Sequence, residues 1–438
     1  MKKLALPLML WSLSAAAVET AGVDPLGPAL AEARARHAAV FIDFAAVWCH
    51  SCYFMDKEVL TGPQWDAVKK RAVIVQADAD SPEGSAAVKQ FGIAGFPTYL
   101  VLDEHGNEVG RILGDRPRQE FYALLEPILA RGATLEHWQA QVKDGGAQSV
   151  AAGRTVLEAY YQRLDPNAGL AWLAALPEPA RAALAGDTKA ADLRARLELF
   201  GAADRNDAAA CARVAPAVLG TLDCDHLMEL SKFQACLSKE PLDAQRAALA
   251  PFKPRMEQLQ ASVLVKGKGV CSDTRGVVET AVDLYDGLED QAAREQVLKQ
   301  GVEYSERKLK GRPGSDRGLA DNLRFYRELQ KNDAALDALY PKLIAAWPDD
   351  YVYAYRWGKS LARRGKFEQA LPLLEQAAPK SFGRNRLWVA QWRAFVLLKL
   401  NRADEAREQA REALQANGPW FEKDAAELKA VVDGKTPA

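Results

Sequence analysis

The sequence lacks an excess of charge of either sign. Its 438 residues include 57 lysines and arginines against 58 aspartates and glutamates, which leaves a formal net charge of −1. Phosphate backbones and anionic lipids are held by clustered positive charge, which this balance does not supply in bulk. Nucleic-acid binding is therefore not expected. A content of 49% hydrophobic and 26% charged residues is that of an ordinary folded chain, long enough for roughly two to four domains.

Beyond its first residues the sequence also lacks a long apolar run. A transmembrane helix needs roughly 20 mostly apolar residues, and no later segment approaches that length. At the start, Lys2 and Lys3 precede an apolar stretch at 4–13 and small residues at 14–17. This pattern predicts a signal peptide over 1–17 and a periplasmic or otherwise exported protein without a membrane span in its mature chain. An uncleaved N-terminal anchor is the alternative, and a lipid anchor is not expected because no cysteine follows the small residues.

Cysteine is scarce, and the six cysteines fall into two groups. Two are spaced as Cys-x-x-Cys, and four stand apart in sequence of helical character: Cys211, Cys224, Cys236 and Cys271. The four are predicted to form two structural disulfides, as suits an exported chain. Three pairings are possible, and the sequence does not choose among them. A redox relay with the first group is a second interpretation, and a metal site at 224–226 would need more ligands than its one histidine.

Between residues 28 and 131 the sequence alternates between helical and strand patterns. Short apolar runs rich in β-branched residues alternate with segments of helical spacing, which indicates a central sheet covered by helices on both faces. The predicted strands are 40–45, 72–77, 98–102 and 108–113, the last two forming a hairpin, and the predicted helices are 28–36, 49–60, 82–90 and 116–131.

The Cys-x-x-Cys pair, Cys49 and Cys52, follows the first predicted strand directly and opens a helix. Free amide groups and the macrodipole at a helix start favour negative charge, so Cys49, expected to be the more exposed thiol, is predicted to ionise near neutral pH. Its thiolate would attack a partner disulfide, and Cys52 would then displace the partner. A zinc site is the alternative, but zinc needs four ligands and no second pair stands at comparable spacing.

The motif Trp48-Cys49-His50-Ser51-Cys52, followed by Gly95-Phe96-Pro97-Thr98, resembles the thioredoxin family over about a quarter of the chain. The resemblance implies an α/β thioredoxin-like fold in which Pro97 is cis and packs beside the pair. The backbone of Phe96 would pair with an extended substrate, so Trp48, His50, Phe96 and Pro97 are the predicted substrate-binding residues. Trp48 would also shield the thiols.

Two acidic residues complete the resemblance. Asp43 matches a buried acid beneath the second cysteine, which would take the proton from Cys52, with a purely structural acid as the alternative. Within the family the sequence is most similar to the C-terminal domain of the disulfide interchange reductase DsbD, where a second acid matches Asp56; a solvated helix residue is the alternative. The dipeptide His50-Ser51 departs from the related pairs, which leaves the redox direction open. A protonated His50 would stabilise the thiolate.

After residue 133 strand patterns stop and helical spacing continues to the end. The turn segments 364–367 and 400–403 match when the sequence is shifted by 36 residues, a period close to that of helix-pair repeats. The hairpins resemble tetratricopeptide repeats (TPR), with an incomplete first-helix signature. The predicted domains are a thioredoxin-like domain at 18–132, a helical domain with four cysteines at 133–318 and TPR-like repeats at 319–438.

These features predict an exported thiol:disulfide oxidoreductase that acts on protein disulfides as a reductase or isomerase, without a cofactor or a metal. Its expected partners are protein thiols or disulfides, an upstream membrane donor of electrons, and a peptide or protein on the helical region. The alternative is a binding or chaperone module that uses its thioredoxin-like domain and helices as a docking scaffold. A reductase for cytochrome maturation is a third interpretation. It is less favoured because no proline lies between the two cysteines, as it does in many such proteins.

Overall fold

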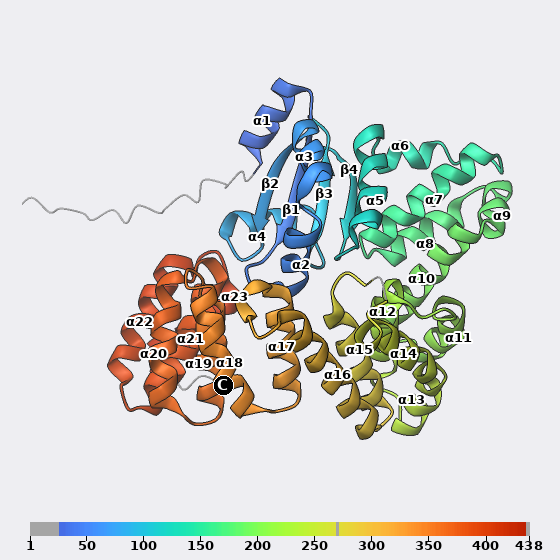
Figure 1. Cartoon of the computed structure of the whole chain (residues 1–438). Coiled ribbons are helices and arrows are strands. Elements are labelled where there is room, and N and C mark those ends of the chain that lie inside the picture. Colours follow the sequence, from blue (N-terminus) through green and yellow to red (C-terminus); the bar gives the residue numbers. More distant parts are fainter. Residues whose placement is uncertain (1–25, 269–270, 435–438) are drawn as a thin grey trace, which may run out of the picture.

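The structure is a computed structural model that describes residues 26–268 and 271–434. The predicted signal peptide lies outside the described residues. An N-terminal domain with the only strands of the described chain is followed by a helical region whose helices run from Leu135 to Val432, so the predicted fold class is confirmed. In Figure 1 the helical region passes along one side of the N-terminal domain and then beneath it.

The N-terminal domain is built on a four-stranded mixed sheet. The strands are β1 (Ala39–Ala45), β2 (Ala72–Asp78), β3 (Thr98–Leu102) and β4 (Glu108–Leu113), and their order across the sheet is β2-β1-β3-β4. Strand β1 pairs in parallel with β2 and antiparallel with β3, and β3 pairs antiparallel with β4. All four strands coincide with the predicted ones to within a residue. Strand β1 lies between two neighbouring strands, and its five middle residues are buried.

Alternation along β1 divides the domain into two cores. Val40, Ile42 and Phe44 point to one face, beneath α1 (Gly27–Arg36) and α4 (Pro82–Gln90). Phe41 points to the other face, which is covered by three helices: α2 (His50–Glu58), α3 (Gly62–Arg71) and α5 (Arg118–Arg131). Successive side chains of a strand point to opposite faces, so Asp43 shares the face of Phe41 and lies on the side of α2.

The helical region contains eighteen α-helices within the described residues. They are α6 (Leu135–Ala140), α7 (Ala147–Gln162), α8 (Pro166–Ala175), α9 (Glu178–Gly186), α10 (Thr188–Asp204), α11 (Ala208–Val218), α12 (Leu227–Leu237), α13 (Leu242–Leu249), α14 (Lys253–Gln260), α15 (Thr274–Gly287), α16 (Gln291–Leu309), α17 (Arg317–Leu329), α18 (Asp333–Ala346), α19 (Val352–Arg363), α20 (Phe367–Ala377), α21 (Gly383–Lys399), α22 (Ala403–Asn417) and α23 (Glu422–Val432). Short 3-10 helices lie at Cys224–His226, Ala250–Phe252, Pro313–Ser315 and Ala378–Lys380, with a π-helical turn at Ala261–Val265. No helix among the described residues is long and apolar enough to cross a membrane.

The helices α17 to α22 form three successive hairpins in the part of the chain for which the sequence predicts repeats. Each hairpin turns at a residue with positive φ: Lys331, Gly365 and Asn401. A left-handed residue ends a helix by satisfying its last carbonyl groups, so these positions let each hairpin reverse within a few residues. Whether the hairpins act as TPR-like repeats stays a prediction.

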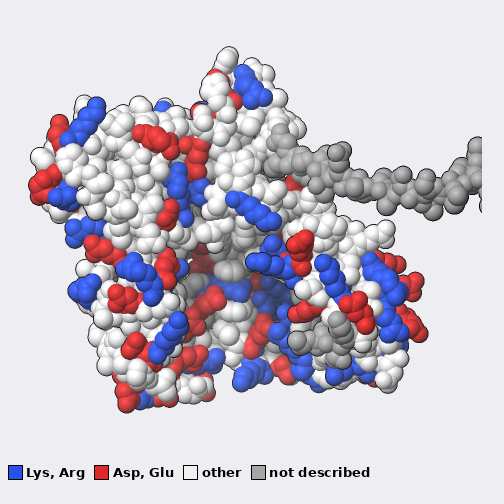
Figure 2. All heavy atoms as spheres, turned by 180° about the vertical axis from the view of Figure 1, so that it is seen from behind, with Lys and Arg blue, Asp and Glu red and all other residues white. Residues whose placement is uncertain are grey.

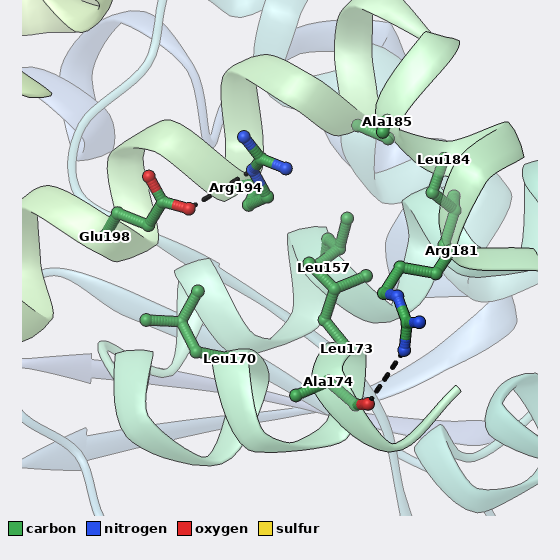
Figure 3. Close-up of a pocket in the computed structure, with 10 residues that line it drawn as sticks. Leu157, Leu170, Leu173, Ala174, Arg181, Leu184, Ala185, Arg194 and Glu198 are labelled. Atoms are coloured by element: carbon green, nitrogen blue, oxygen red, sulfur yellow. Dashed lines mark hydrogen bonds and ion pairs between the residues drawn. The ribbon is translucent and has the colours of Figure 1, made fainter. Parts of the chain in front are cut away.

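A small pocket of about 240 Å³ lies between α7, α8, α9 and α10, well within the helical region (Figure 3). Leucines and alanines line most of it. Of its charged residues, Arg181 donates to the carbonyl of Ala174, and Arg194 pairs with Glu198. None of its residues belongs to the N-terminal domain, so this pocket is no part of the cysteine site.

Candidate active site

The two cysteines of the Cys-x-x-Cys pair stand at the start of α2 and form a disulfide. Cys49 is the N-cap residue, and its Sγ accepts a hydrogen bond from the backbone amide of Cys52 at 3.2 Å. An N-cap acceptor satisfies one of the free amides of the first turn, where the helix dipole also favours negative charge. The sulfur of Cys49 therefore sits where a thiolate would be stabilised.

The loop before β3 closes over the pair. The peptide bond between Phe96 and Pro97 is cis, which confirms the prediction for Pro97. The carbonyl of Pro97 accepts a hydrogen bond from the amide of Gly114 at 2.8 Å, and Phe96 packs against the buried cluster of Ala46, Cys49 and Cys52. The ring centroids of Phe96 and Trp48 lie 6.4 Å apart in an edge-to-face arrangement. Trp48 and Phe96, two of the predicted substrate-binding residues, thus lie beside the pair, and their role in binding stays a prediction.

Asp43 is a buried acid on the side of the sheet that α2 covers. Burial raises its pKa to about 7, with a further contribution from the negative charge of Asp56. Its Oδ1 has no hydrogen-bond partner within the described chain. A carboxyl group with this pKa exchanges a proton near neutral pH, as a group that accepts a proton from a thiol must.

Asp56 lies one helical turn beyond Cys52 on α2, at the solvent-facing side of the helix. The surrounding protein removes enough water to raise its pKa, and the charge of Arg317 opposes that rise. The two acids influence each other electrostatically, as the dependence of Asp43 on Asp56 indicates. The catalytic roles of both acids stay predictions.

His50, inside the Cys-x-x-Cys motif, contacts a residue far along the chain. Its Nδ1 lies 2.6 Å from Oδ2 of Asp273, which precedes α15 in the helical region. Burial would raise the pKa of Asp273, but the hydrogen bond and charge of His50 outweigh it and hold that pKa below its usual value. The hydroxyl of Ser51 lies 3.3 Å from the same nitrogen. His50 is therefore held by the helical region.

Trp48 is fixed from two sides. Its Nε1 donates to Oδ2 of the buried Asp80 at 2.6 Å, and the backbone amide of Arg384 donates to the carbonyl of Asp80 at 2.9 Å. The backbone carbonyl of Trp48 accepts a hydrogen bond from Arg356 at 3.3 Å. The indole also packs against an apolar cluster of α17, α18 and α19. The tryptophan expected to meet a substrate thus contacts the same chain.

Further contacts join α2 to the helical region. Lys57 pairs with Asp316 at 2.6 Å, and the guanidinium of Arg317 lies 4.3 Å from the ring centroid of Tyr53. These pairs are separated by more than 250 residues in the sequence, and no local pattern marks either partner. Sequence reasoning could not have found them, or the link between His50 and Asp273.

Both cysteines of the pair are buried. Cys49 was expected to be the more exposed thiol, but Cys49 and Cys52 each keep only 4% of their surface exposed. Ala45, Trp48 and Phe96 of the N-terminal domain pack against the cluster that contains them. Figure 2 shows a hollow between the upper and lower parts of the molecule, seen from behind, with acidic and basic side chains around it.

The other four cysteines form two disulfides in the helical region. Cys211 pairs with Cys236 and Cys224 with Cys271, which selects one of the three pairings that the sequence left open. The first disulfide joins α11 to α12 in the core, and the second joins the short helix at Cys224–His226 to the segment before α15. Their structural role stays a prediction.

Comparison with known proteins gives matches in the N-terminal part of the chain. Residues 26–128 match the family model of the thioredoxin-like domain. The thiol:disulfide interchange protein DsbD of Cronobacter sakazakii is 33% identical over 25% of this chain and 21% of that protein. The chloroplastic thioredoxin-like protein HCF164 of Oryza sativa subsp. japonica is 27% identical over 25% of this chain and 40% of that protein.

A thioredoxin from Thermus thermophilus, whose solution structure is known, is 32% identical to this chain. The match covers 24% of this chain and 85% of that one, with a TM-score of 0.23. The chain spans about a fifth to two fifths of the length of the curated relatives described above. These similarities concern the domain that carries the Cys-x-x-Cys pair.

Proposed function

Since residues 26–128 form a domain of the thioredoxin-like family, we propose that this chain is an exported thiol:disulfide oxidoreductase that acts on protein disulfides through Cys49 and Cys52. The observation that carries the proposal is the position of the Cys49 sulfur at the N-terminus of α2, where it accepts the amide hydrogen of Cys52. A thiolate is the attacking species in disulfide exchange, and this position favours it.

The proposed reduction has two steps. The Cys49 thiolate attacks a client disulfide, forms a mixed disulfide, and releases the other client sulfur, which takes up a proton. Asp43 then accepts the proton of Cys52, and the Cys52 thiolate attacks the Cys49 sulfur. The bond between Cys49 and Cys52 forms as the client sulfur leaves, so two electrons pass to the client and the pair is oxidised.

The substitution Cys52→Ser tests this scheme, because it removes the second step. The variant is expected to accumulate clients bound to Cys49 through a mixed disulfide that dithiothreitol releases. The measurement is electrophoresis without reductant, followed by mass spectrometry of the linked peptides. The matched control is the double variant Cys49→Ser/Cys52→Ser, which should trap nothing. Equal trapping by both would contradict the proposal.

Asp43→Asn should slow the second step, since an amide does not accept the proton of Cys52. We expect a fall of about 10²-fold in insulin reduction at pH 7. In the unmodified protein the rate should rise with pH through about 7, as Asp43 ionises, and the variant should lose that dependence. Asp66→Asn, at an exposed position on α3, is the matched control and should leave the rate unchanged.

The stability of the fold gives Asp43 a second readout. The pKa of Asp43 is higher in the folded than in the unfolded state. Its contribution to the free energy of unfolding is therefore full below about pH 4 and is lost as pH rises through about 7. The free energy of unfolding should fall across that window by up to about 1.4 kcal/mol per pH unit. Denaturant titrations should show that Asp43→Asn removes this slope. If Asp43→Asn changed neither the pH dependence of the free energy of unfolding nor the rate of insulin reduction, Asp43 would have no role in proton transfer or in the pH dependence of stability.

The proposed clients are proteins whose disulfides reach the pair by way of the helical region, which would select or hold them. The pair would be recharged by a membrane-bound donor of electrons. One observation favours the alternative, a binding or chaperone module: only 4% of Cys49 is exposed. A wild-type chain that never exceeds glutathione alone in insulin reduction would favour that docking function.

A further inference from the structure

The disulfide between Cys224 and Cys271 is followed, on both of the chain segments that it joins, by residues that are hydrogen-bonded to the N-terminal domain. Directly after Cys271, the hydroxyl of Ser272 and the backbone amide of Asp273 both donate to Oδ2 of Asp115, in the loop that follows β4. The side chain of Asp273 is bonded to His50 at 2.6 Å. Two peptide units therefore separate Cys271 from a residue that contacts the centre of the active motif.

The Cys224 end of the disulfide is held against the same loop. Asp225, the next residue, accepts from Arg116 at 3.4 Å. The backbone amide of Arg116 in turn donates to the sulfur of Met55, on α2, at 3.4 Å. Both cysteines of this disulfide are thus followed by residues bonded to the part of the N-terminal domain that surrounds the Cys-x-x-Cys pair.

Chain length limits how far the two disulfides can lie from each other. A residue step spans at most about 3.6 Å. Cys49 is one step from His50, and Cys271 is two steps from Asp273, whose carboxylate touches the His50 ring. Cys49 and Cys271 therefore lie on segments joined by this hydrogen bond, and exchange between their sulfurs requires the segment 271–273 to move toward Cys49.

The other disulfide of the helical region has none of these properties. Cys211 and Cys236 are 0% and 2% exposed and belong to a large apolar core. Cys224 and Cys271 are both partly exposed. Disulfide exchange requires access of a thiolate to one of the two sulfurs, so only the disulfide beside the active motif meets that condition.

We propose that the Cys224–Cys271 disulfide is a second redox-active site, which exchanges electrons with the Cys49–Cys52 pair inside one molecule. The inference rests on the proposed function, because it needs Cys49 to attack as a thiolate. It departs from the expectation that all four cysteines of the helical region are structural, and it assigns that role to Cys211 and Cys236 alone.

The exchange is balanced within the chain. In the reduced pair, the Cys49 thiolate attacks Cys271, a bond forms between these sulfurs, and Cys224 leaves as a thiolate and takes a proton. The thiol of Cys52 gives its proton to Asp43, and the resulting Cys52 thiolate attacks the sulfur of Cys49. The Cys49–Cys52 bond forms, Cys271 leaves and is protonated, and two electrons have moved from the first pair to the second.

The rate of reduction of each disulfide tests the proposal. The oxidised full-length protein is mixed with reduced glutathione, quenched by alkylation, and each cysteine is followed by mass spectrometry. Cys224 and Cys271 should be reduced about tenfold faster in the wild type than in Cys49→Ser/Cys52→Ser, because the pair supplies a more reactive thiolate close by. The matched internal control is Cys211–Cys236, whose rate should be equal in both proteins.

Two outcomes separate this inference from the proposed function. If the wild type reduces insulin but Cys224 and Cys271 react equally fast in both proteins, the relay is wrong and the oxidoreductase remains. If the wild type fails to reduce insulin, the proposed function fails, and the glutathione experiment still shows whether the two disulfides exchange. Equal rates in that case would overturn the relay as well.

A trapping experiment tests the contact directly. Cys52→Ser/Cys224→Ser leaves Cys49 and Cys271 as the free thiols, which glutathione disulfide should join within one monomer while it is reduced to two glutathione molecules. In Cys52→Ser/Cys211→Ser the free thiol of the helical region is that of Cys236 in the core, and Cys49 should form no link to Cys236. Equal linkage in both variants, or none in the first while its Cys49 still binds glutathione, would overturn the proposal.

Discussion

Cys49→Ser is expected to lower the rate of insulin reduction to that of dithiothreitol without protein. Serine keeps the size of the side chain and can still accept the amide hydrogen of Cys52 at the start of α2. It supplies no thiolate, so the mixed disulfide with the client cannot form. The measurement is the turbidity of insulin B chains as they precipitate, at a fixed concentration of dithiothreitol.

The matched control for this loss is Cys211→Ser/Cys236→Ser. It removes a disulfide from the core of the helical region and leaves the Cys-x-x-Cys pair intact. We expect insulin reduction to continue in this variant at a temperature where circular dichroism shows it folded. If Cys49→Ser kept the wild-type rate, the thiol chemistry would not reside at α2, and the docking function would be favoured.

Asp321→Asn is expected to destabilise the protein by about 3–5 kcal/mol, the usual cost of breaking a buried ion pair. Asp321 is 0% exposed and pairs with three arginines, Arg275, Arg324 and Arg356, which come from α15, α17 and α19. Burial alone would raise its pKa, but these arginines hold the pKa far below its usual value. Neutralising it leaves three guanidinium groups facing one another in the interior.

Urea unfolding followed by circular dichroism would measure this cost. Asp404→Asn is the control, since Asp404 is 97% exposed and pairs only with Arg407 at the surface; we expect a change of about 0.5 kcal/mol or less. Arg356 also donates to the carbonyl of Trp48. The variant should therefore alter tryptophan fluorescence before global unfolding, whereas similar stabilities of the two variants would contradict the role of this cluster.

The sequence was sufficient for the N-terminal domain because its signals are local. Strand β1 is a short buried run that ends at a helix start, and the cysteine pair lies at that junction in both the prediction and the structure. The cis bond before Pro97 followed from resemblance alone. Asp43 followed from the same resemblance, and alternation along β1 explains why it faces α2.

The sequence was insufficient wherever distant segments meet. Nothing near Asp273 distinguishes it from an ordinary N-cap residue, and its bond to His50 spans 223 positions. The low exposure of Cys49 depends on tertiary packing as well, and no local pattern indicated it. The pairing of Cys224 with Cys271 likewise depends on how those helices pack, which periodicity does not encode.

The attachment of Val47 and Trp48 to the apolar cluster of α17 to α19 has a practical consequence. A recombinant fragment that ended at Arg131 would present both side chains to water beside an unpaired His50. Such a fragment would be prone to self-association, since exposed apolar patches associate with other apolar surfaces. Its reduction potential would describe the fragment alone, so biochemical constants for this protein should be measured on the full-length chain.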